Sequence, residues 1–134
     1  MANISAYLSK AALDWVLLGA APTRPSTIAV GLSLGSPTSV SGSEITTGSG
    51  YARQTATMAA AGTPTSSGTA TNNNAMTFGP FSGAASISGI DIWDTVLTLN
   101  SGNLLLNGLL ATARTVGIGD SLVIASGALT VSLA

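Results

Sequence analysis

The chain has 134 residues, of which 46% are apolar and only 7% are charged, and its formal net charge is −1. This length suits one domain with a single core, so residues 1–134 are expected to fold as one unit. The small net charge argues against nucleic acid or an anionic membrane as a partner. Cysteine and histidine are absent, which rules out disulfides and removes the commonest metal ligands and general bases.

The scarcity of charged residues indicates that the protein works inside an assembly. Soluble domains usually carry about 25% charged residues. Here the surface must be built largely from Ser, Thr, Gly, Asn and Ala, which are small and uncharged. The most apolar run, residues 11–21, is interrupted by Asp14 and is shorter than the roughly 20 residues that a membrane helix needs. The composition therefore favours protein neighbours over a membrane.

Residues 3–18 have the pattern of an amphipathic helix. Apolar residues recur at steps of four and three, which places them on one face: Ile4, Leu8, Ala11, Trp15 and Leu18. Asn3 or Ser5 can cap its start, Gly19 suits a left-handed residue at its end, and Pro22 prevents continuation. This face is expected to pack on the chain's own sheet or on a neighbouring subunit, and Trp15 and Trp93 are expected to be core anchors.

The rest of the chain is predicted to be β-structure. Alternation over residues 27–34 and 51–58 predicts two half-buried strands, while the low-complexity tract 59–74 has the composition of a linker. Two apolar runs within residues 86–110 flank a Gly-containing turn, which predicts a hairpin. Further short strands are expected at 75–78, 112–116, 121–125 and 128–133. One helix and about eight strands predict a mainly β fold: an antiparallel β-sandwich or barrel of jelly-roll type over residues 27–134.

No grouping of residues indicates catalysis or cofactor binding. The sequence Gly117-Ile118-Gly119 lacks the third glycine of a dinucleotide motif and is predicted to be a turn. Asp91 is expected to pair with Arg53 or Arg114, and Asp94 to bond the backbone of its loop. The aspartates lack the spacing of a calcium loop. We therefore expect no enzyme, no catalytic residue, no metal and no cofactor.

Several phrases follow one another along the chain: AYLSKAALDWVLLG, TIAVGLSL, GSEITTGSGYARQTAT, NNNAMTFGPF, GIDIWDT, SGNLLLNGLL and GDSLVIASGALTVSLA. In this order and spacing they resemble a family of small phage virion structural proteins, which are described as tail fibre or minor structural proteins. Proteins of this appearance also serve as capsid cement or decoration proteins. The resemblance spans nearly the whole chain and implies a virion protein of the head or of the tail.

The first functional expectation is a cement protein on the outer surface of the head. It would stabilise the shell by binding several subunits of the major capsid protein, and it would form a homo-oligomer, with a trimer favoured over a dimer. The alternative is a tail fibre or baseplate component that contacts the host receptor. The interface is predicted to lie on the helix and at the hairpin tip, where exposed apolar side chains would mark it: Ile4, Leu8, Trp15, Val96, Leu97 and Leu99.

Overall fold

The computed structural model describes residues 3–35, 38, 43–46, 50–59, 68–97 and 101–133. In this part of the chain the predicted class is confirmed: the fold is mainly β, with antiparallel sheets and one N-terminal helix, and the described strands form no closed barrel. The elements are β1 (Asn3–Ile4), α1 (Ala6–Leu18), β2 (Ala29–Ser33), β3 (Gln54–Thr55), β4 (Gly68–Thr71), β5 (Met76–Phe78), β6 (Ala85–Trp93), β7 (Leu104–Val116), β8 (Leu122–Ile124) and β9 (Thr130–Leu133).

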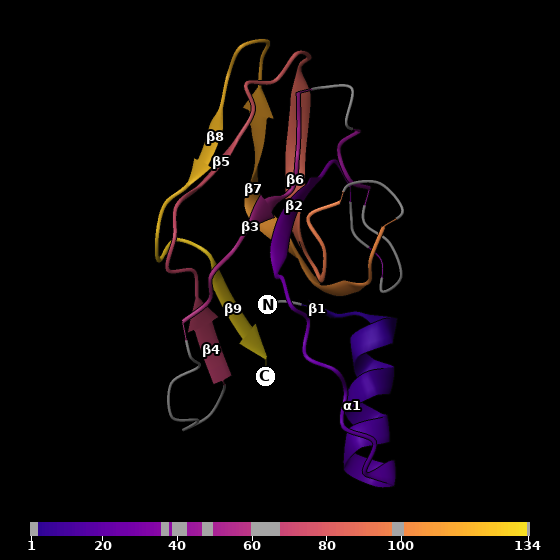
Figure 1. Ribbon diagram of the computed structural model, residues 1–134. Helices are drawn as coiled ribbons and strands as arrows, with labels where there is room; N and C mark the ends of the chain where they lie inside the picture. The colour runs from indigo at the N-terminus through magenta and orange to yellow at the C-terminus, as the bar shows by residue number, and fades with distance from the viewer. Residues whose placement is uncertain are drawn as a thin grey trace.

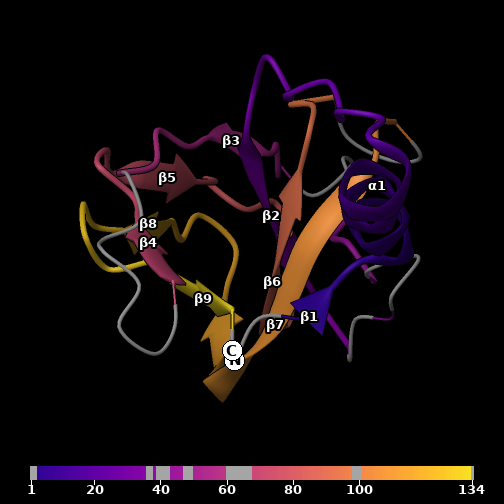
Figure 2. The ribbon, with the colours of Figure 1, turned by 90° about the horizontal axis from the view of Figure 1, so that it is seen from below.

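The main sheet has five strands in the order β1-β7-β6-β2-β3, and each neighbouring pair is antiparallel. The long β6–β7 hairpin is at its centre, which confirms the hairpin predicted over residues 86–110 (Figure 1). Two ribbons, β4–β9 and β5–β8, complete the fold. Figure 2 shows that α1 lies on one side of the main sheet and the ribbons lie on the other.

The hydrophobic core lies between the main sheet and the ribbons. Val30, Leu32 and Ile87 from the sheet form one cluster with Met76 and Phe78 from β5. Val30 and Leu32 share a face because side chains alternate along a strand. The pairing of β6 with β7 shifts register between Ile87 and Gly89. Such a bulge lets Ile87 join this core, which strict alternation along β6 would not allow.

The ends of α1 follow the predicted capping pattern. The backbone N–H of Leu8 donates a hydrogen bond to Ser5 Oγ at 3.0 Å, so Ser5 is the N-cap residue. Gly19 adopts φ 70°, the left-handed conformation that ends many helices. The predicted start at residue 3 is wrong, because Asn3 and Ile4 form β1 and pair with β7. A strand that is only two residues long therefore anchors the helix to the sheet.

Three predicted segments differ from the structure. The separate strand expected at 112–116 is the continuation of β7, which carries extra residues opposite the step from Ile87 to Gly89 and then pairs with β6 again as far as Val116. The strand expected at 51–58 reduces to β3, since from Thr57 onward the backbone bonds to the loop around Asn74 instead. Part of the tract 59–74 is ordered as β4, whereas residues 60–67 lie outside the described part of the chain.

One buried amide explains why the end of the low-complexity tract is ordered. The Asn72 side chain donates a hydrogen bond to the carbonyl of Ala125 at 2.9 Å and accepts one from the N–H of Leu129 at 2.8 Å. These bonds cross more than fifty positions of sequence, and Asn72 is almost completely buried. A buried polar group that is fully hydrogen-bonded fixes its surroundings. The composition of the tract contains no signal of this long-range contact.

Candidate functional site

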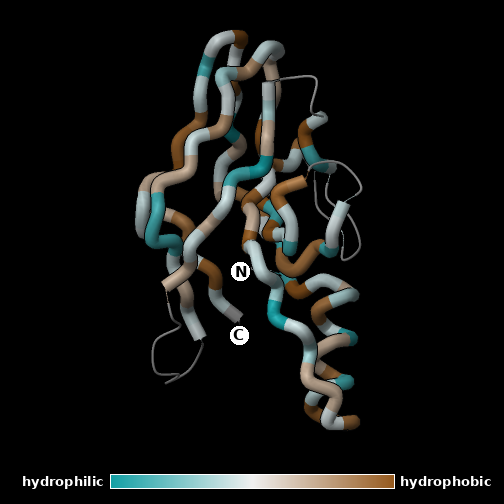
Figure 3. The backbone as a smooth tube through the Cα atoms, viewed as in Figure 1, coloured by the Kyte–Doolittle hydropathy of each residue, from teal (hydrophilic) through white to brown (hydrophobic). Residues whose placement is uncertain are grey.

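The helix α1 is an exposed apolar surface. No residue of the helix is buried, and the exposed fractions of Trp15, Val16 and Leu18 are 58%, 71% and 77%. Successive helix residues are rotated by about 100°, so the run from Trp15 to Leu18 presents apolar side chains on all sides. Figure 3 shows this apolar character as brown segments along α1. A helix that is apolar all round normally lies inside a protein core.

This exposure corrects the prediction for Trp15, which is not a core anchor. The single apolar stripe holds only near the start of α1, where Leu8 and Ala11 are half-buried and the helix contacts β7. Towards its C-terminus α1 extends beyond the main sheet (Figure 1), and Trp15 keeps more than half of its surface exposed. Trp93, by contrast, is buried as predicted.

The charges on α1 leave its apolar surface free of unpaired charge. Lys10 and Asp14 form an ion pair one turn apart, and no other charged residue lies in the helix. Thirteen residues make a helix about 20 Å long. No helix in the described part of the chain is long and apolar enough to cross a membrane.

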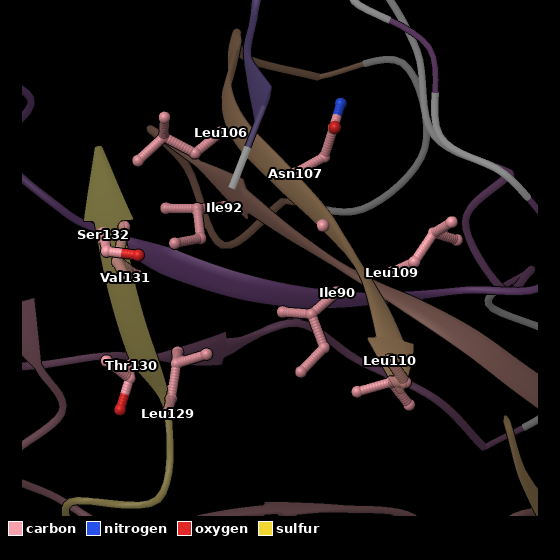
Figure 4. A pocket seen from close by; sticks show the side chains of 11 residues that line it. Ile90, Ile92, Leu106, Asn107, Leu109, Leu110, Leu129, Thr130, Val131 and Ser132 are labelled. Atoms are coloured by element: carbon pink, nitrogen blue, oxygen red, sulfur yellow. The ribbon is translucent and has the colours of Figure 1, made fainter. Parts of the chain in front are cut away.

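A second apolar surface is a groove on the other side of the main sheet. It has a volume of about 180 Å³ and lies between the sheet and β9. In Figure 4, side chains of β6 and β7 point towards β9, whereas Asn107 and Leu109 point away. Period two on each strand explains this division. The apolar lining comes from three strands and the residue before β9: Ile90, Ile92, Leu106, Leu110, Leu129 and Val131.

The groove continues along the sheet. A second hollow of about 290 Å³ shares Ile90 and Leu110 with it and reaches Leu122 and Ile124 of β8. No charged residue lines the first hollow, and Arg114 is the only charged residue in the lining of the second. The main sheet and the ribbons thus leave a trough between them that is uncharged except for Arg114.

A buried ion pair holds the base of the hairpin tip. Arg53 Nε and Nη2 donate to the two carboxylate oxygens of Glu44 at 2.7 Å each, and the Tyr51 hydroxyl donates to Glu44 Oε1 at 2.7 Å. The Arg53 guanidinium also lies 3.9 Å from the centroid of the Trp93 ring. Its Nη1 donates to the carbonyl of Thr95 at 3.2 Å. Burial and the adjacent Glu44 carboxylate raise the pKa of Tyr51, so the phenol keeps its proton.

Asp91 is not paired with Arg53 or Arg114, contrary to the prediction. Its side chain is fully buried, and neither carboxylate oxygen has a hydrogen-bond partner. Arg53 bonds Glu44 instead, because Glu44 approaches from the loop in a bidentate geometry. Asn107 lies opposite Asp91 in the register, and its Oδ1 also lacks a partner. Burial raises the pKa of Asp91 to about 6, the Glu44 charge adds to this rise, and Arg53 opposes it.

The other predicted aspartate role is confirmed. Asp94 accepts hydrogen bonds from the backbone N–H and the side-chain amide of Asn103, each at 2.7 Å, and so closes the hairpin loop. Asp120 accepts from the N–H of Gly117 at 2.8 Å within the predicted turn. Among the described residues, no three acidic, histidine or cysteine side chains gather where they could hold a metal ion.

The predicted interface residues fall on two separate surfaces. Ile4 lies in β1 with its side chain exposed, and Leu8 and Trp15 lie on α1. Val96 and Leu97 are exposed at the hairpin tip, at 41% and 65%, while Leu99 lies outside the described residues. Their role as an interface stays a prediction. The prediction from sequence did not include the exposed residues Leu13, Val16 and Leu17. The consecutive run Val16-Leu17-Leu18 is the signal that could have found them, because it indicates a helix that is apolar on more than one side.

Comparison with protein families decides the class of this protein. Residues 3–132 match the family described as podophage GP4 fiber I protein gp80. The chain belongs to this family. It is therefore a phage fibre structural protein, with its place in the tail fibre part of the virion. A search of curated proteins finds no match.

The expectation of a capsid cement protein on the head is wrong, because the matched family is a fibre family. The alternative expectation, a tail fibre component, agrees with the matched family. Low charge and a surface of small residues suit any protein packed into a virion, whether in the head or in the tail. Composition therefore indicated only a protein packed in an assembly and carried no information on its position in the particle; the phage virion class came from the resemblance of the ordered phrases.

Proposed function

We propose that this chain is a structural subunit of the phage tail fibre that joins the fibre through α1. One observation carries the proposal: the last four residues of α1, from Trp15 to Leu18, are apolar on all sides of the helix and are exposed. Each large apolar side chain that becomes fully buried contributes about 1.5–3 kcal/mol. Several such side chains within one helix supply enough free energy for a lasting contact between subunits, and exposed apolar patches of this size mark interaction sites.

We further propose that the neighbours are copies of the same chain, in a trimer rather than a dimer. Soluble homo-oligomers mostly have closed symmetry. A contact with one flat partner covers a single side of a helix, whereas α1 presents apolar side chains on every side near its end. Three copies offer each helix two neighbours, which supports the higher number.

The test is the mass of the purified chain in solution, measured by light scattering after size exclusion. The unmodified chain is expected to be an oligomer, and the double variant Trp15→Ser with Leu18→Ser is expected to be a monomer with unchanged circular dichroism. The matched control is Leu34→Ser with Ile118→Ser, which removes two exposed apolar side chains outside α1 and outside the lining of the two hollows. A monomeric unmodified chain, or an oligomer that survives the α1 double substitution, would refute the proposal.

A further inference from the structure

We infer that the groove between the main sheet and β9 receives α1 of a neighbouring copy. This inference rests on the proposed function and names the surface that α1 contacts. The helix is a convex apolar surface without unpaired charge, and the groove is a concave apolar surface without a charged lining residue. No described residue of the chain covers the end of the helix or fills the groove. Because the helix and the groove lie on the same polypeptide, one assembly of identical copies can bury both surfaces.

The helix cannot reach the groove of its own chain. Only Ser5 separates β1 from α1, and its N–H donates to the carbonyl of Leu105 at 3.0 Å. This bond fixes the start of the helix at β7, on the side of the sheet opposite to the ribbons (Figure 2). The groove opens towards β9, on the ribbon side (Figure 4). An α1 that enters this groove would therefore come from another copy.

The sizes of the two surfaces show which part of α1 would enter. A helix with its side chains is about 10–12 Å wide, which is too large for a hollow of about 180 Å³. The groove can take a row of side chains from one side of the helix. The rest of the helix would then lie against the strand backbones at the rim of the groove. Thr130 and Ser132 of β9 line the groove and would flank the inserted row.

The contact gives the assembly a direction. Each copy would donate its helix and receive one at a different place, so the interface is heterologous rather than two-fold. Such contacts close into a ring when the rotation between neighbours allows it, and in a closed ring of three every helix has a groove and every groove has a helix. A ring of this type agrees with the trimer that we propose.

Cysteine cross-linking tests the inference directly, because the native chain contains no cysteine. Two pairs join the exposed end of α1 to the groove: Val16→Cys with Thr130→Cys, and Leu18→Cys with Ser132→Cys. Each pair is placed in one chain and treated with a short bismaleimide before denaturing electrophoresis. We expect covalent dimers and trimers from the double variants. The four single variants are the matched controls and are expected to give no cross-linked species.

Three outcomes would overturn the inference, and they separate it from the proposed function. Cross-linking of the Val16→Cys single variant to itself would show that helices meet each other, which refutes the groove and keeps the role of α1. An oligomer in which neither double variant cross-links beyond its single variants would show that α1 contacts another surface. A monomeric chain before cross-linking would refute the proposed function and this inference together.

Discussion

At the scale of single residues, Asp91 is a carboxylic acid that the fold buries without a hydrogen-bond partner. It lies fully buried in the central strand of the main sheet without a hydrogen-bond partner, opposite Asn107, whose side-chain oxygen is also unpartnered. Burying a carboxylate in this way disfavours its charge and is costly. When Asp91 is protonated, its hydroxyl becomes a donor, which suits an environment with an unpartnered acceptor. The charge on Asp91 is therefore expected to lower the free energy of unfolding at neutral pH.

We expect stability to fall as the pH rises from about 4 to about 6. The pKa of Asp91 is raised from its ordinary value of 3.8 to about 6. In this window the folded chain keeps a proton that the unfolded chain has lost, so the stabilisation present below the lower pKa is lost as the pH passes the higher one. The shift corresponds to about 2–3 kcal/mol.

The variant Asp91→Asn checks this by urea unfolding across that pH range. It is expected to unfold at higher urea than the native chain near neutral pH and to lose the slope between the two pKa values, because asparagine carries no charge at any pH. Asp120→Asn, in an exposed turn, is the control that should keep the slope. An unchanged slope in Asp91→Asn would assign the pH dependence to another group.

The buried pair of Glu44 and Arg53 provides a second prediction for single residues. Glu44→Gln leaves the Arg53 charge unpaired in a site where its side chain has no exposed area, so it is expected to lower the free energy of unfolding by about 3–5 kcal/mol. Asp14→Asn breaks the exposed pair with Lys10 and should cost less than about 1 kcal/mol. Thermal or urea unfolding of the two variants measures the difference. Equal losses would show that burial of the first pair has no energetic consequence.

At the scale of elements, the β6–β7 hairpin combines a rigid base with an apolar tip. Arg53 bonds the carbonyls of Thr95 and Ser101 at 3.2 and 3.1 Å, and Asp94 bonds Asn103 on the other side of the loop. Val96 and Leu97 are exposed between these anchors. Hydrogen bonds therefore hold the base of the loop that presents the apolar tip, which suits a contact surface.

We expect Leu97→Ser to leave the domain folded and to weaken assembly. An exposed side chain contributes little to the stability of its own chain, so the free energy of unfolding should change by less than about 0.5 kcal/mol. The midpoint of dissociation, measured by sedimentation over a range of concentrations, should move to higher protein concentration. Ile118→Ser, on the turn between β7 and β8, is the matched control. An unaltered midpoint in Leu97→Ser would remove the tip from the interface.

For the whole molecule, the distribution of charge sets how assembly responds to salt. The chain has four basic and five acidic residues, and four of these nine charges are paired within the described structure. The surfaces that we assign to assembly are apolar. Salt screens exposed charges over about 10 Å at moderate ionic strength, and it has little effect on the burial of apolar area.

Raising the concentration of sodium chloride is therefore expected to leave the oligomer intact, and sulfate is expected to strengthen it because this ion favours apolar burial. Light scattering at increasing concentrations of each salt measures the effect. Dissociation by sodium chloride would contradict an apolar interface and would indicate that ionic contacts hold the subunits together.

The amino-acid sequence by itself determined the local features of this protein. Ser5 and Gly19 at the ends of α1, the strand β2 and the turn after Asp94 depend on neighbouring residues, and each was predicted from the residues themselves. The alternation in β2 was wrong about burial, because the strand is buried on both faces instead of one. The order of phrases along the chain also identified a phage structural protein. Local capping, periodicity and turn chemistry act over a few positions and can therefore be read from a single sequence.

Only the tertiary structure decided which groups meet across long stretches of chain. Arg53 bonds Glu44 and leaves Asp91 alone, Asn72 orders a tract that has the composition of a linker, and β7 continues through residues predicted as a separate strand. The groove also needs β6, β7 and β9 together. These features depend on the register and on how loops return to the sheet, which no local pattern encodes. The exposure of Trp15 also depends on the tertiary structure, since only the position of the main sheet shows which part of α1 it covers.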